Sequence, residues 1–357
     1  MYRMRTIPIR GLVASDALVL SRVAVVAVIP LSERVAPGRA RGQLRLRRPR
    51  GLVLSLLAAL SLFGCAASPR PSALRPAQQP LQVMASVLPV TLFTRAVASG
   101  CAQVESLVPV NLSPHDWQVT PADLARLSQA DVLVINGLGL ESHLDKLVEA
   151  SGNTRLRRID TSRGVAPITE PSQAAHADHA SDHGPLNPHI WLDPRRAAQQ
   201  VATIRDGLVA ADPACRSRYQ ANAAAFLTEL DRLDRDLARQ FAPHAGQLLL
   251  AFHAIGPYFA QRYQLRSEAL VDDPEQSPSA ADLERFSRLA RASGVRALVA
   301  ETQMSNKAFV ALAHDLGLPL VSLDPLEIAP ADPSLAAAYY LSTMRRNGQQ
   351  LLQALGP

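Results

Sequence analysis

The sequence predicts an α/β protein with mainly parallel sheets and enough folded chain for two domains. Strand-like apolar runs alternate with helix-like segments from residue 83 onward, a pattern typical of parallel strands joined by helices. About 275 residues remain once the leader is set aside, which is room for two domains of ordinary size. A long amphipathic segment separates the two halves.

In the first half, Val83–Val87 is a strand-like run. Pro89 suits the first position of a helix that continues to Ala98, because proline lacks the amide hydrogen that a helix start leaves unpaired. Val104–Val110 and Val132–Asn136 are predicted to be the next strands.

The segment Pro213–Phe241 is predicted to be one long helix. Its apolar residues recur at steps of three or four, as an amphipathic helix requires. These residues are Tyr219, Ala223, Phe226, Leu230, Leu233, Leu237 and Phe241. The stripe by itself indicates only burial, and a partner helix in a coiled coil is the alternative. Further strands are predicted at Leu248–Phe252, Ala297–Ala300 and Leu320–Leu323.

Three histidine motifs and a later aspartate are the candidate metal ligands: His115, His189, His253 and Asp324, spaced by 74, 64 and 71 residues. Three neutral imidazoles and one carboxylate suit a borderline divalent cation, zinc above all. A local zinc finger is excluded, since the sequence has no closely spaced cysteine pair. A single histidine beside a proline is more often structural, so the prediction depends on the whole set.

Three of the four candidates follow predicted strands. His115 comes after Val104–Val110, while His253 and Asp324 close the strands at 248–252 and 320–323. Ligands of open parallel sheets gather at the carboxyl ends of the strands. His189 lies in a proline-flanked segment that periodicity does not place.

The motifs around these residues resemble the metal-binding receptors of ABC importers, the cluster A-I solute-binding proteins of the ZnuA/TroA type. The resemblance runs in order from about Val83 to the C-terminus. It is carried by Ser113-Pro114-His115-Asp116-Trp117 with Thr120-Pro121-Ala122-Asp123-Leu124, Asn136-Gly137-Leu138-Gly139-Leu140-Glu141, Asn187-Pro188-His189-Ile190-Trp191-Leu192-Asp193-Pro194, Phe252-His253 with Tyr258-Phe259, and Ser322-Leu323-Asp324-Pro325-Leu326.

This resemblance implies two lobes joined by one rigid helix, with the metal site in the cleft between the lobes. His115 and His189 would come from one lobe, and His253 and Asp324 from the other. The expected organisation is a leader (1–65), a flexible tether (66–82), an N-terminal lobe (83–212), the linking helix (213–243) and a C-terminal lobe (244–357). The protein would act as a monomer that captures Zn²⁺ and delivers it to an ABC permease.

The leader is predicted to be a lipoprotein signal peptide at about residues 41–64. Four arginines within 45–50 precede the uncharged apolar run Leu52–Phe63, which is too short to span a membrane. The run ends in Leu62-Phe63-Gly64-Cys65, which resembles a lipobox, so Cys65 is the predicted lipidation site and the protein a periplasmic, membrane-anchored lipoprotein. Ordinary cleavage near Gly64 or Ala66 is the alternative. Residues 1–40 fit no part of a signal peptide and are interpreted as a misplaced start, or else as a disordered extension.

The positive charge belongs to the leader. Residues 1–50 carry eleven arginines against two acids, a net charge of +9, whereas the whole chain carries +6. The remainder is therefore slightly acidic, at −3. Nucleic acid is excluded as a partner, because no basic surface is left to follow phosphates.

Other polar residues have weaker assignments. His176, His179 and His183 lie in the segment 174–185, where histidine-rich sequence can capture metal weakly, or serve only as a solvated linker. Glu301 ends a predicted strand and is a candidate for orienting a ligand imidazole, with a helix cap as the alternative. Asp123 and Glu141 are interpreted as structural. The histidines at 143, 244 and 314 match no ligand motif, and pairing of Cys101 with Cys215 is left open.

Alternatives to a zinc receptor remain at this point. A zinc hydrolase or lyase would need an open coordination position, which a fourth protein ligand such as Asp324 closes, and no His-Glu-x-x-His motif is present. The protein is therefore expected not to be an enzyme. A manganese or iron receptor of the same family would use harder ligands, and His253 is the position that favours zinc. Nothing in the sequence separates an adhesin from a receptor.

Overall fold

The computed structural model describes residues 79–141, 143–169, 186–271, 274, 277–302, 306–332 and 334–356. All of them belong to one compact unit, residues 71–357. The predictions for the leader, for Cys65 and for the loop histidines lie outside the described residues.

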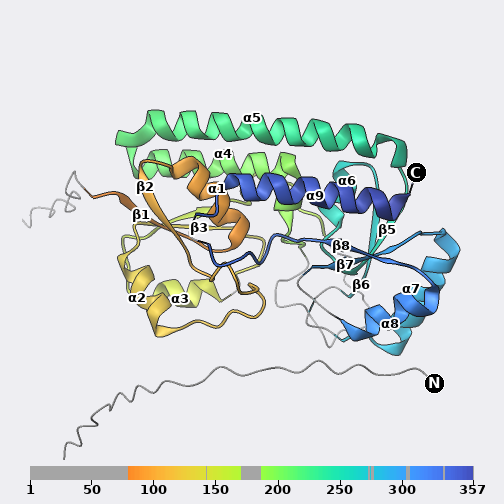
Figure 1. The fold of residues 1–357 in the computed structure, drawn as a ribbon. Helices are drawn as coiled ribbons and strands as arrows, with labels where there is room; N and C mark the ends of the chain where they lie inside the picture. Colours follow the sequence, from red (N-terminus) through yellow and green to blue (C-terminus); the bar gives the residue numbers. More distant parts are fainter. Residues whose placement is uncertain are drawn as a thin grey trace, which may run out of the picture. The chain divides into compact units, whose positions relative to one another are not determined.

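The first half of the chain forms an α/β lobe, here called the N-lobe (Figure 1). Its sheet is parallel, in the order β2-β1-β3-β4, with strands β1 (Leu81–Ala85), β2 (Ala102–Ser106), β3 (Val132–Ile135) and β4 (Arg157–Asp160). Helices α1 (Leu88–Ala98) and α4 (Pro194–Ala211) cover one face, and α2 (Pro121–Gln129) and α3 (Leu144–Ala150) cover the other. Neighbouring residues of β1 show this: Val83 packs with the first pair of helices and Met84 with the second.

The C-lobe repeats this arrangement. Its parallel sheet has the order β6-β5-β7-β8, with strands β5 (Leu248–His253), β6 (Arg266–Val271), β7 (Leu298–Glu301) and β8 (Leu320–Leu323). Helices α7 (Ala280–Ser293) and α8 (Lys307–Leu316) cover one face; α9 (Ala337–Leu355) packs on the other, beside the short helix α6 (Pro257–Arg262). The prediction of two mainly parallel α/β lobes is confirmed.

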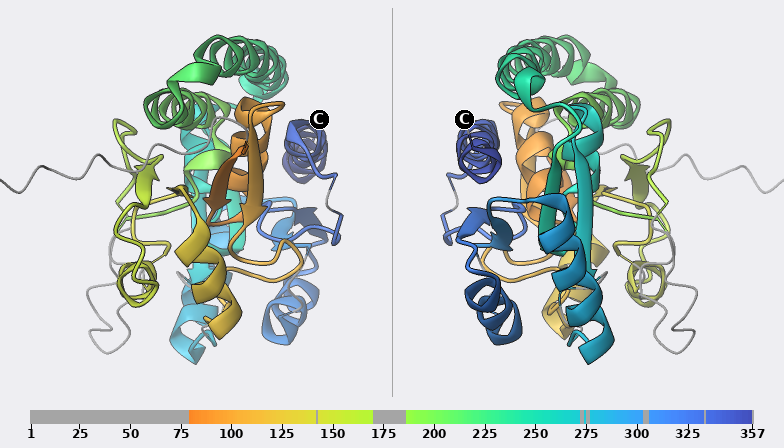
Figure 2. Two further views of the ribbon diagram at one scale, coloured as in Figure 1. Left: turned by 90° about the vertical axis from the view of Figure 1, so that its left-hand side faces the viewer. Right: turned by 90° about the vertical axis from the view of Figure 1, so that its right-hand side faces the viewer.

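One long helix, α5 (Arg216–Phe241), connects the lobes. Figure 1 shows it running across the top of both lobes, and it packs on α4, α1 and α9. The side views of Figure 2 keep α4 next to it. All seven residues of its predicted apolar stripe are buried. They belong to one hydrophobic core that contains Val83 of the N-lobe sheet and Leu249 of the C-lobe sheet, so the two lobes share packing rather than only a tether.

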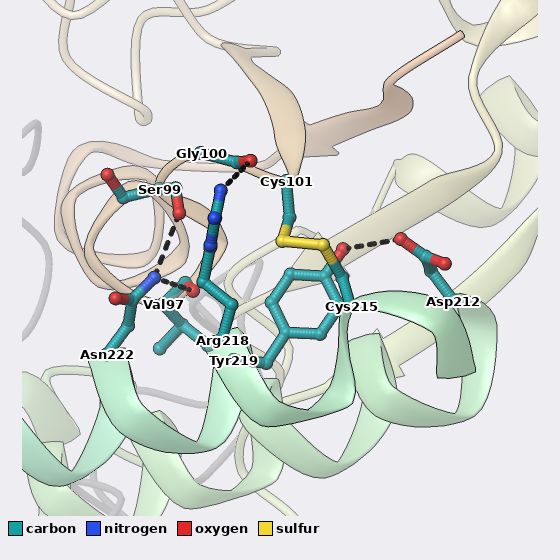
Figure 3. Close-up of a disulfide and its surroundings, with 9 residues drawn as sticks. All are labelled: Val97, Ser99, Gly100, Cys101, Asp212, Cys215, Arg218, Tyr219 and Asn222. Atoms are coloured by element: carbon teal, nitrogen blue, oxygen red, sulfur yellow. Dashed lines mark hydrogen bonds between the residues drawn. A yellow bond between two sulfur atoms is a disulfide. The ribbon is translucent and has the colours of Figure 1, made fainter. Parts of the chain in front are cut away.

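A disulfide fixes the start of α5 to the N-lobe (Figure 3). Cys101, just before β2, is bonded to Cys215, just before α5, with 6.2 Å between their Cα atoms. Arg218 on the first turn of α5 donates to the carbonyl of Gly100, and Asn222 donates to the carbonyls of Val97 and Ser99. The question that the sequence left open is thus answered in favour of pairing.

Within the described part of the chain, no helix combines the length and the apolar character that crossing a membrane requires.

Candidate metal centre

The candidate site lies where the strand order of the C-lobe sheet reverses. His253 is the last residue of β5, and Glu301 is the last residue of the neighbouring strand β7. The connections from β5 to β6 and from β6 to β7 leave in opposite directions across the sheet, which opens a crevice at the carboxyl ends of these two strands. The fold therefore presents both side chains at the edge where ligands of parallel sheets bind.

The three histidines predicted as ligands come together at this crevice. The ring of His253 lies 5.0 Å from that of His189 and 6.0 Å from that of His115, centroid to centroid. His189 and His253 are buried, and the His115 side chain is only 5% exposed. A carboxylate completes the cluster: His115, His189 and Glu327 each offer one ligand atom, and these atoms all lie within 4.8 Å of one another.

His189 is held from both sides of its ring. Nδ1 lies 3.0 Å from Oδ1 of Asn187, and Nε2 lies 3.2 Å from Oε1 of Glu327. Burial lowers the pKa of His189 to about 4, although the hydrogen bond to Glu327 acts in the opposite direction. Burial thus favours the neutral imidazole, which is the form that binds metals.

Glu327 carries the negative charge of the cluster. Its side chain is 2% exposed, and its Oε1 lies 3.2 Å from His189 and 3.5 Å from Nε2 of His115. Burial alone would raise the pKa of this carboxyl, but hydrogen bonds from the two imidazoles outweigh burial and leave the pKa well below its ordinary value. A buried carboxylate that stays ionised is suited to compensate the charge of a bound cation.

His253 has its own carboxylate partner. Its Nδ1 lies 3.2 Å from Oε1 of Glu301, and both side chains are almost fully buried. A carboxylate accepts, so Nδ1 carries the proton and Nε2 is left as the nitrogen available to a metal. Glu301 therefore contacts an imidazole of the kind that the sequence analysis expected it to orient, and that role stays a prediction. No side-chain capping bond to the following segment is found among the described residues.

The fourth predicted ligand, Asp324, is engaged elsewhere. Its Oδ1 accepts a hydrogen bond of 2.8 Å from the backbone N–H of Leu326, and its Oδ2 lies 3.8 Å from Arg346. The residue that brings a carboxylate to the histidines is Glu327, three positions later. Asp324, the acid that ends the strand, was the predicted ligand, whereas Glu327, the acid after the next turn, lies in the cluster.

The path of the backbone after Asp324 explains why Glu327, and not Asp324, reaches the histidines. Leu326 is fully buried with φ of +64°, a left-handed conformation that is uncommon for a residue with a branched side chain. The chain then crosses to the N-lobe, where the N–H of Ala329 donates to the carbonyl of Val110 and the indole of Trp191 donates to the carbonyl of Pro325. Glu327 lies within this crossing segment and so reaches His115 and His189. A leucine residue does not indicate a positive φ, so this turn could not be predicted from the sequence.

The remaining polar candidates are structural or peripheral. Asp123 forms a reciprocal capping box with Thr120 at the start of α2, and Glu141 accepts hydrogen bonds from Ser86 and from the backbone of the Gly137 turn. Both structural interpretations are confirmed. The histidines at 143 and 314 are exposed, whereas the one at 244 is half-buried.

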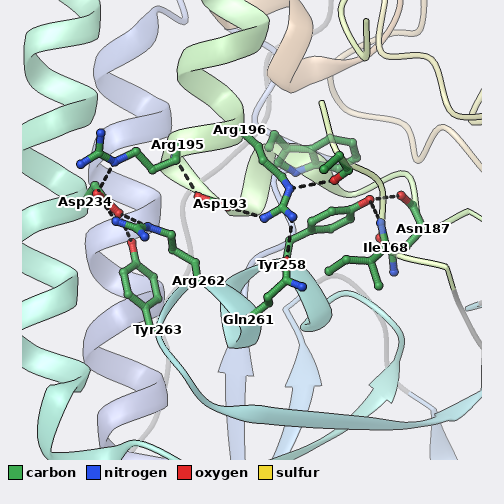
Figure 4. A network of polar contacts seen from close by, with 12 residues as sticks. Ile168, Asn187, Asp193, Arg195, Arg196, Asp234, Tyr258, Gln261, Arg262 and Tyr263 are labelled. Atoms are coloured by element: carbon green, nitrogen blue, oxygen red, sulfur yellow. Dashed lines mark hydrogen bonds and ion pairs between the residues drawn. The ribbon is translucent and has the colours of Figure 1, made fainter. Parts of the chain in front are cut away.

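A second polar network joins both lobes to α5 (Figure 4). Asp234, a buried member of α5, accepts from Arg195 of α4 at 2.8 Å and from two nitrogens of Arg262 of α6 at 2.6 Å. Arg196 pairs with Asp193 and donates to Gln261 of α6. The helices that follow His189 and His253 in the chain are thus fixed to the same carboxylate. Asp234 could not be recognised from the sequence, because it lies beside the apolar stripe on a helix that carries many other charged residues.

Two α/β lobes with parallel sheets, a long linking helix and a buried histidine cluster between the lobes define a solute-binding protein of the metal-receptor class. The profile of the family described as "Zinc-uptake complex component A periplasmic" matches residues 83–354. The chain belongs to this family.

Two relatives show the extent of the similarity. The zinc-binding lipoprotein AdcA of Streptococcus pneumoniae serotype 4 is 28% identical over 307 residues, 85% of this chain and 60% of AdcA. The zinc uptake protein ZnuA of Bacillus subtilis is 27% identical over 286 residues, 77% of this chain and 88% of ZnuA. The chain therefore spans less than two thirds of AdcA but most of ZnuA.

Solved structures agree with the fold. A crystal structure of ZnuA has 30% identity and a TM-score of 0.66, covering 78% of this chain and 100% of that protein. A ZnuA deletion mutant with zinc bound has 31% identity and a TM-score of 0.67, covering 78% of this chain and 99% of that protein.

Proposed function

We propose that this protein is an extracytoplasmic receptor that binds one Zn²⁺ between its lobes and delivers it to an ABC permease. The ligands are His115, His189, His253 and Glu327. The observation that carries the proposal is the convergence of three buried imidazoles and one buried carboxylate from segments on both sides of the crevice. The names of ZnuA and AdcA, which state zinc uptake and zinc binding, support the choice of ion.

The donor set fits zinc as the transported cargo. Three imidazole nitrogens and one carboxylate oxygen match a four-coordinate shell, and a site with fewer histidines would favour a harder cation such as manganese. Glu327 takes the closing position that the sequence analysis gave to Asp324. Because four protein ligands leave no position for an activated water, the site suits capture and release of the ion rather than catalysis.

The proposal includes the parts of the chain outside the described residues. Cys65 carries a lipid that anchors the receptor to the membrane, and the histidines at 176, 179 and 183 capture metal weakly. Residues 66–80 form the tether, because Leu81 and Gln82, which the sequence analysis assigned to it, belong to β1. The receptor acts as a monomer with lobes at 81–212 and 244–357 joined by 213–243. Deleting 174–185 should spare the tight site and remove only weak binding; loss of the tight site would contradict this division.

The first test is metal content. The protein is purified without added metal, analysed by mass spectrometry and titrated with zinc in competition with manganese. One tightly held zinc that manganese does not displace is the expected result. Preferential manganese binding would overturn the choice of ion, and the absence of any tight metal would overturn the site.

A paired substitution tests the ligands themselves. His253→Ala should abolish tight zinc binding while the circular dichroism spectrum stays that of the native protein. His314→Ala is the matched control, because that side chain is 90% exposed and remote from the cluster. Equal zinc affinity in the two variants would contradict the assignment.

A further inference from the structure

Asn187 lies between two proposed ligands, His189 of the N-lobe and His253 of the C-lobe. Its side chain contacts His189 itself and the residue that follows His253. Its amide oxygen contacts His189, and its amide nitrogen lies 2.6 Å from the carbonyl oxygen of Ala254, the residue after His253. Asn187 is fully buried. We propose that Asn187 is a positioning residue that fixes the tautomer of His189 and holds this ligand in register with the C-lobe. The inference rests on the proposed zinc site.

Two backbone groups fix the orientation of the amide. The carbonyl of Ala254 can only accept, so the atom facing it at 2.6 Å is the Nδ2 donor. The backbone N–H of His189 can only donate, so the atom facing it at 2.9 Å is the Oδ1 acceptor. A flipped amide would place two acceptors together and two donors together. The assignment thus follows from the surroundings of Asn187 alone.

The orientation of the amide then determines the tautomer of the ligand. Oδ1 also lies 3.0 Å from Nδ1 of His189 and must accept there, so Nδ1 carries a proton. Nε2 is then the atom that faces Glu327 at 3.2 Å, and a cation that binds there takes the Nε2 lone pair in place of the proton that Nε2 shares with this carboxylate. Asn187 therefore turns the coordinating nitrogen of His189 toward the cluster.

The backbone of this motif is also held from both lobes. The hydroxyl of Tyr258, on α6 of the C-lobe, donates to the carbonyl of Asn187 at 2.7 Å and accepts from the N–H of Ile168. On the N-lobe side, the amide of Asn136 donates to the carbonyl of Pro188 at 2.9 Å. Hydrogen bonds from both lobes thus hold the backbone beside His189, and Tyr258 supplies the one from the C-lobe.

The test measures the tautomer directly. Long-range ¹H–¹⁵N NMR spectra of the metal-free protein should show His189 protonated on Nδ1. Asn187→Ala should lose this signature and weaken zinc binding about 10- to 100-fold, the usual effect of removing a group that orients a metal ligand. Asn187→Asp, which keeps the acceptor but loses the donor to the Ala254 carbonyl, should restore the Nδ1–H signature without restoring the affinity of the unsubstituted protein. An alanine variant with the native tautomer and affinity, or an aspartate variant without the Nδ1–H signature, would overturn the proposal.

Tyr258→Phe tests the second half of the proposal. It should leave the tautomer unchanged and weaken zinc binding roughly three- to tenfold, since one buried hydrogen bond to the motif is lost. Tyr219→Phe is the matched control, because this buried tyrosine bonds to Asp212 far from the site. Equal affinities of the two variants would overturn the role of Tyr258. If the unsubstituted protein binds no zinc, the proposed function fails, whereas the tautomer measurement still decides the role of Asn187.

Discussion

Oε1 of Glu327 lies 3.2 Å from Nε2 of His189, although 138 positions separate the two residues in the sequence. The same oxygen lies 3.5 Å from Nε2 of His115. The carboxylate thus lies between two imidazoles and compensates for its own burial by pairing with them.

The first prediction separates the two acidic candidates. Glu327→Gln keeps the size of the side chain but removes the charge, so we expect zinc affinity to fall at least 10- to 100-fold. Asp324→Asn is the matched substitution, and it should change affinity by less than about threefold because its remaining oxygen still accepts from the Leu326 amide. Competition titration against a zinc indicator measures both. A larger loss in Asp324→Asn would restore Asp324 as the fourth ligand.

The strands and the long helix could largely be predicted because their burial leaves a period in the sequence. β8 and the stripe of α5 agree with the predicted residues. β2 is shorter than predicted and ends at Ser106. Two of the edge strands, β4 (Arg157–Asp160) and β6 (Arg266–Val271), were not predicted. Each carries charged residues, which protect an exposed sheet edge and also remove the apolar pattern that identifies a strand.

In the candidate site, too, the residues in local motifs could be predicted and those placed by contacts between distant segments could not. The three histidines stand in recognisable motifs, and the structure brings them together. Glu327 could not be ranked above Asp324, because the choice depends on the turn at Leu326 and on where the crossing segment contacts the N-lobe. Asn187 was part of a recognised motif, but its contact with Ala254 in the other lobe is a tertiary relationship that no local pattern contains.

The second prediction concerns acid sensitivity of the metal-free protein. The pKa of His189 is about 4 in the folded protein and about 6.5 in an unfolded chain, so only the unfolded chain binds this proton between those pH values. Stability should therefore be complete above about pH 6.5 and decline as the pH falls toward 4, by about 3 kcal/mol in total. The lowered pKa of Glu327 adds a further loss only at more acidic pH. Urea unfolding with a chelator at pH 7.5 and pH 5 measures the decline.

The control for this prediction removes the titrating group. His189→Gln should make the stability between pH 6.5 and pH 4 less dependent on pH, because no imidazole is left to protonate on unfolding at this position. His314→Gln should retain the dependence of the unsubstituted protein, since that side chain is 90% exposed. An identical decline in all three proteins would assign the acid sensitivity to other groups.

The third prediction concerns the carboxylate that joins the lobes to α5. Asp234→Ala removes a side chain that is 1% exposed and bonded to Arg195 and Arg262, so we expect a loss of about 2–3 kcal/mol in the free energy of unfolding. The loss is moderated because Arg195 is 57% exposed and regains water. Asp206→Ala, which breaks an exposed pair with Arg205, should cost less than about 0.5 kcal/mol. Similar costs in the two variants would contradict a special role for Asp234.

The fourth prediction concerns the disulfide. Cys101 and Cys215 are 114 positions apart, so their bond restricts the unfolded chain over a long loop, and replacing both by serine should lower the free energy of unfolding by about 2–5 kcal/mol. The hydrogen bonds of Arg218 and Asn222 to the adjacent turn should keep α5 in place, so the native circular dichroism spectrum should persist. Reductant should lower the stability of the unsubstituted protein to that of the serine variant and leave the variant itself unchanged. If reductant frees both thiols, as a thiol titration would show, without lowering stability, then the packing of α5 rather than the bond fixes this end of the helix.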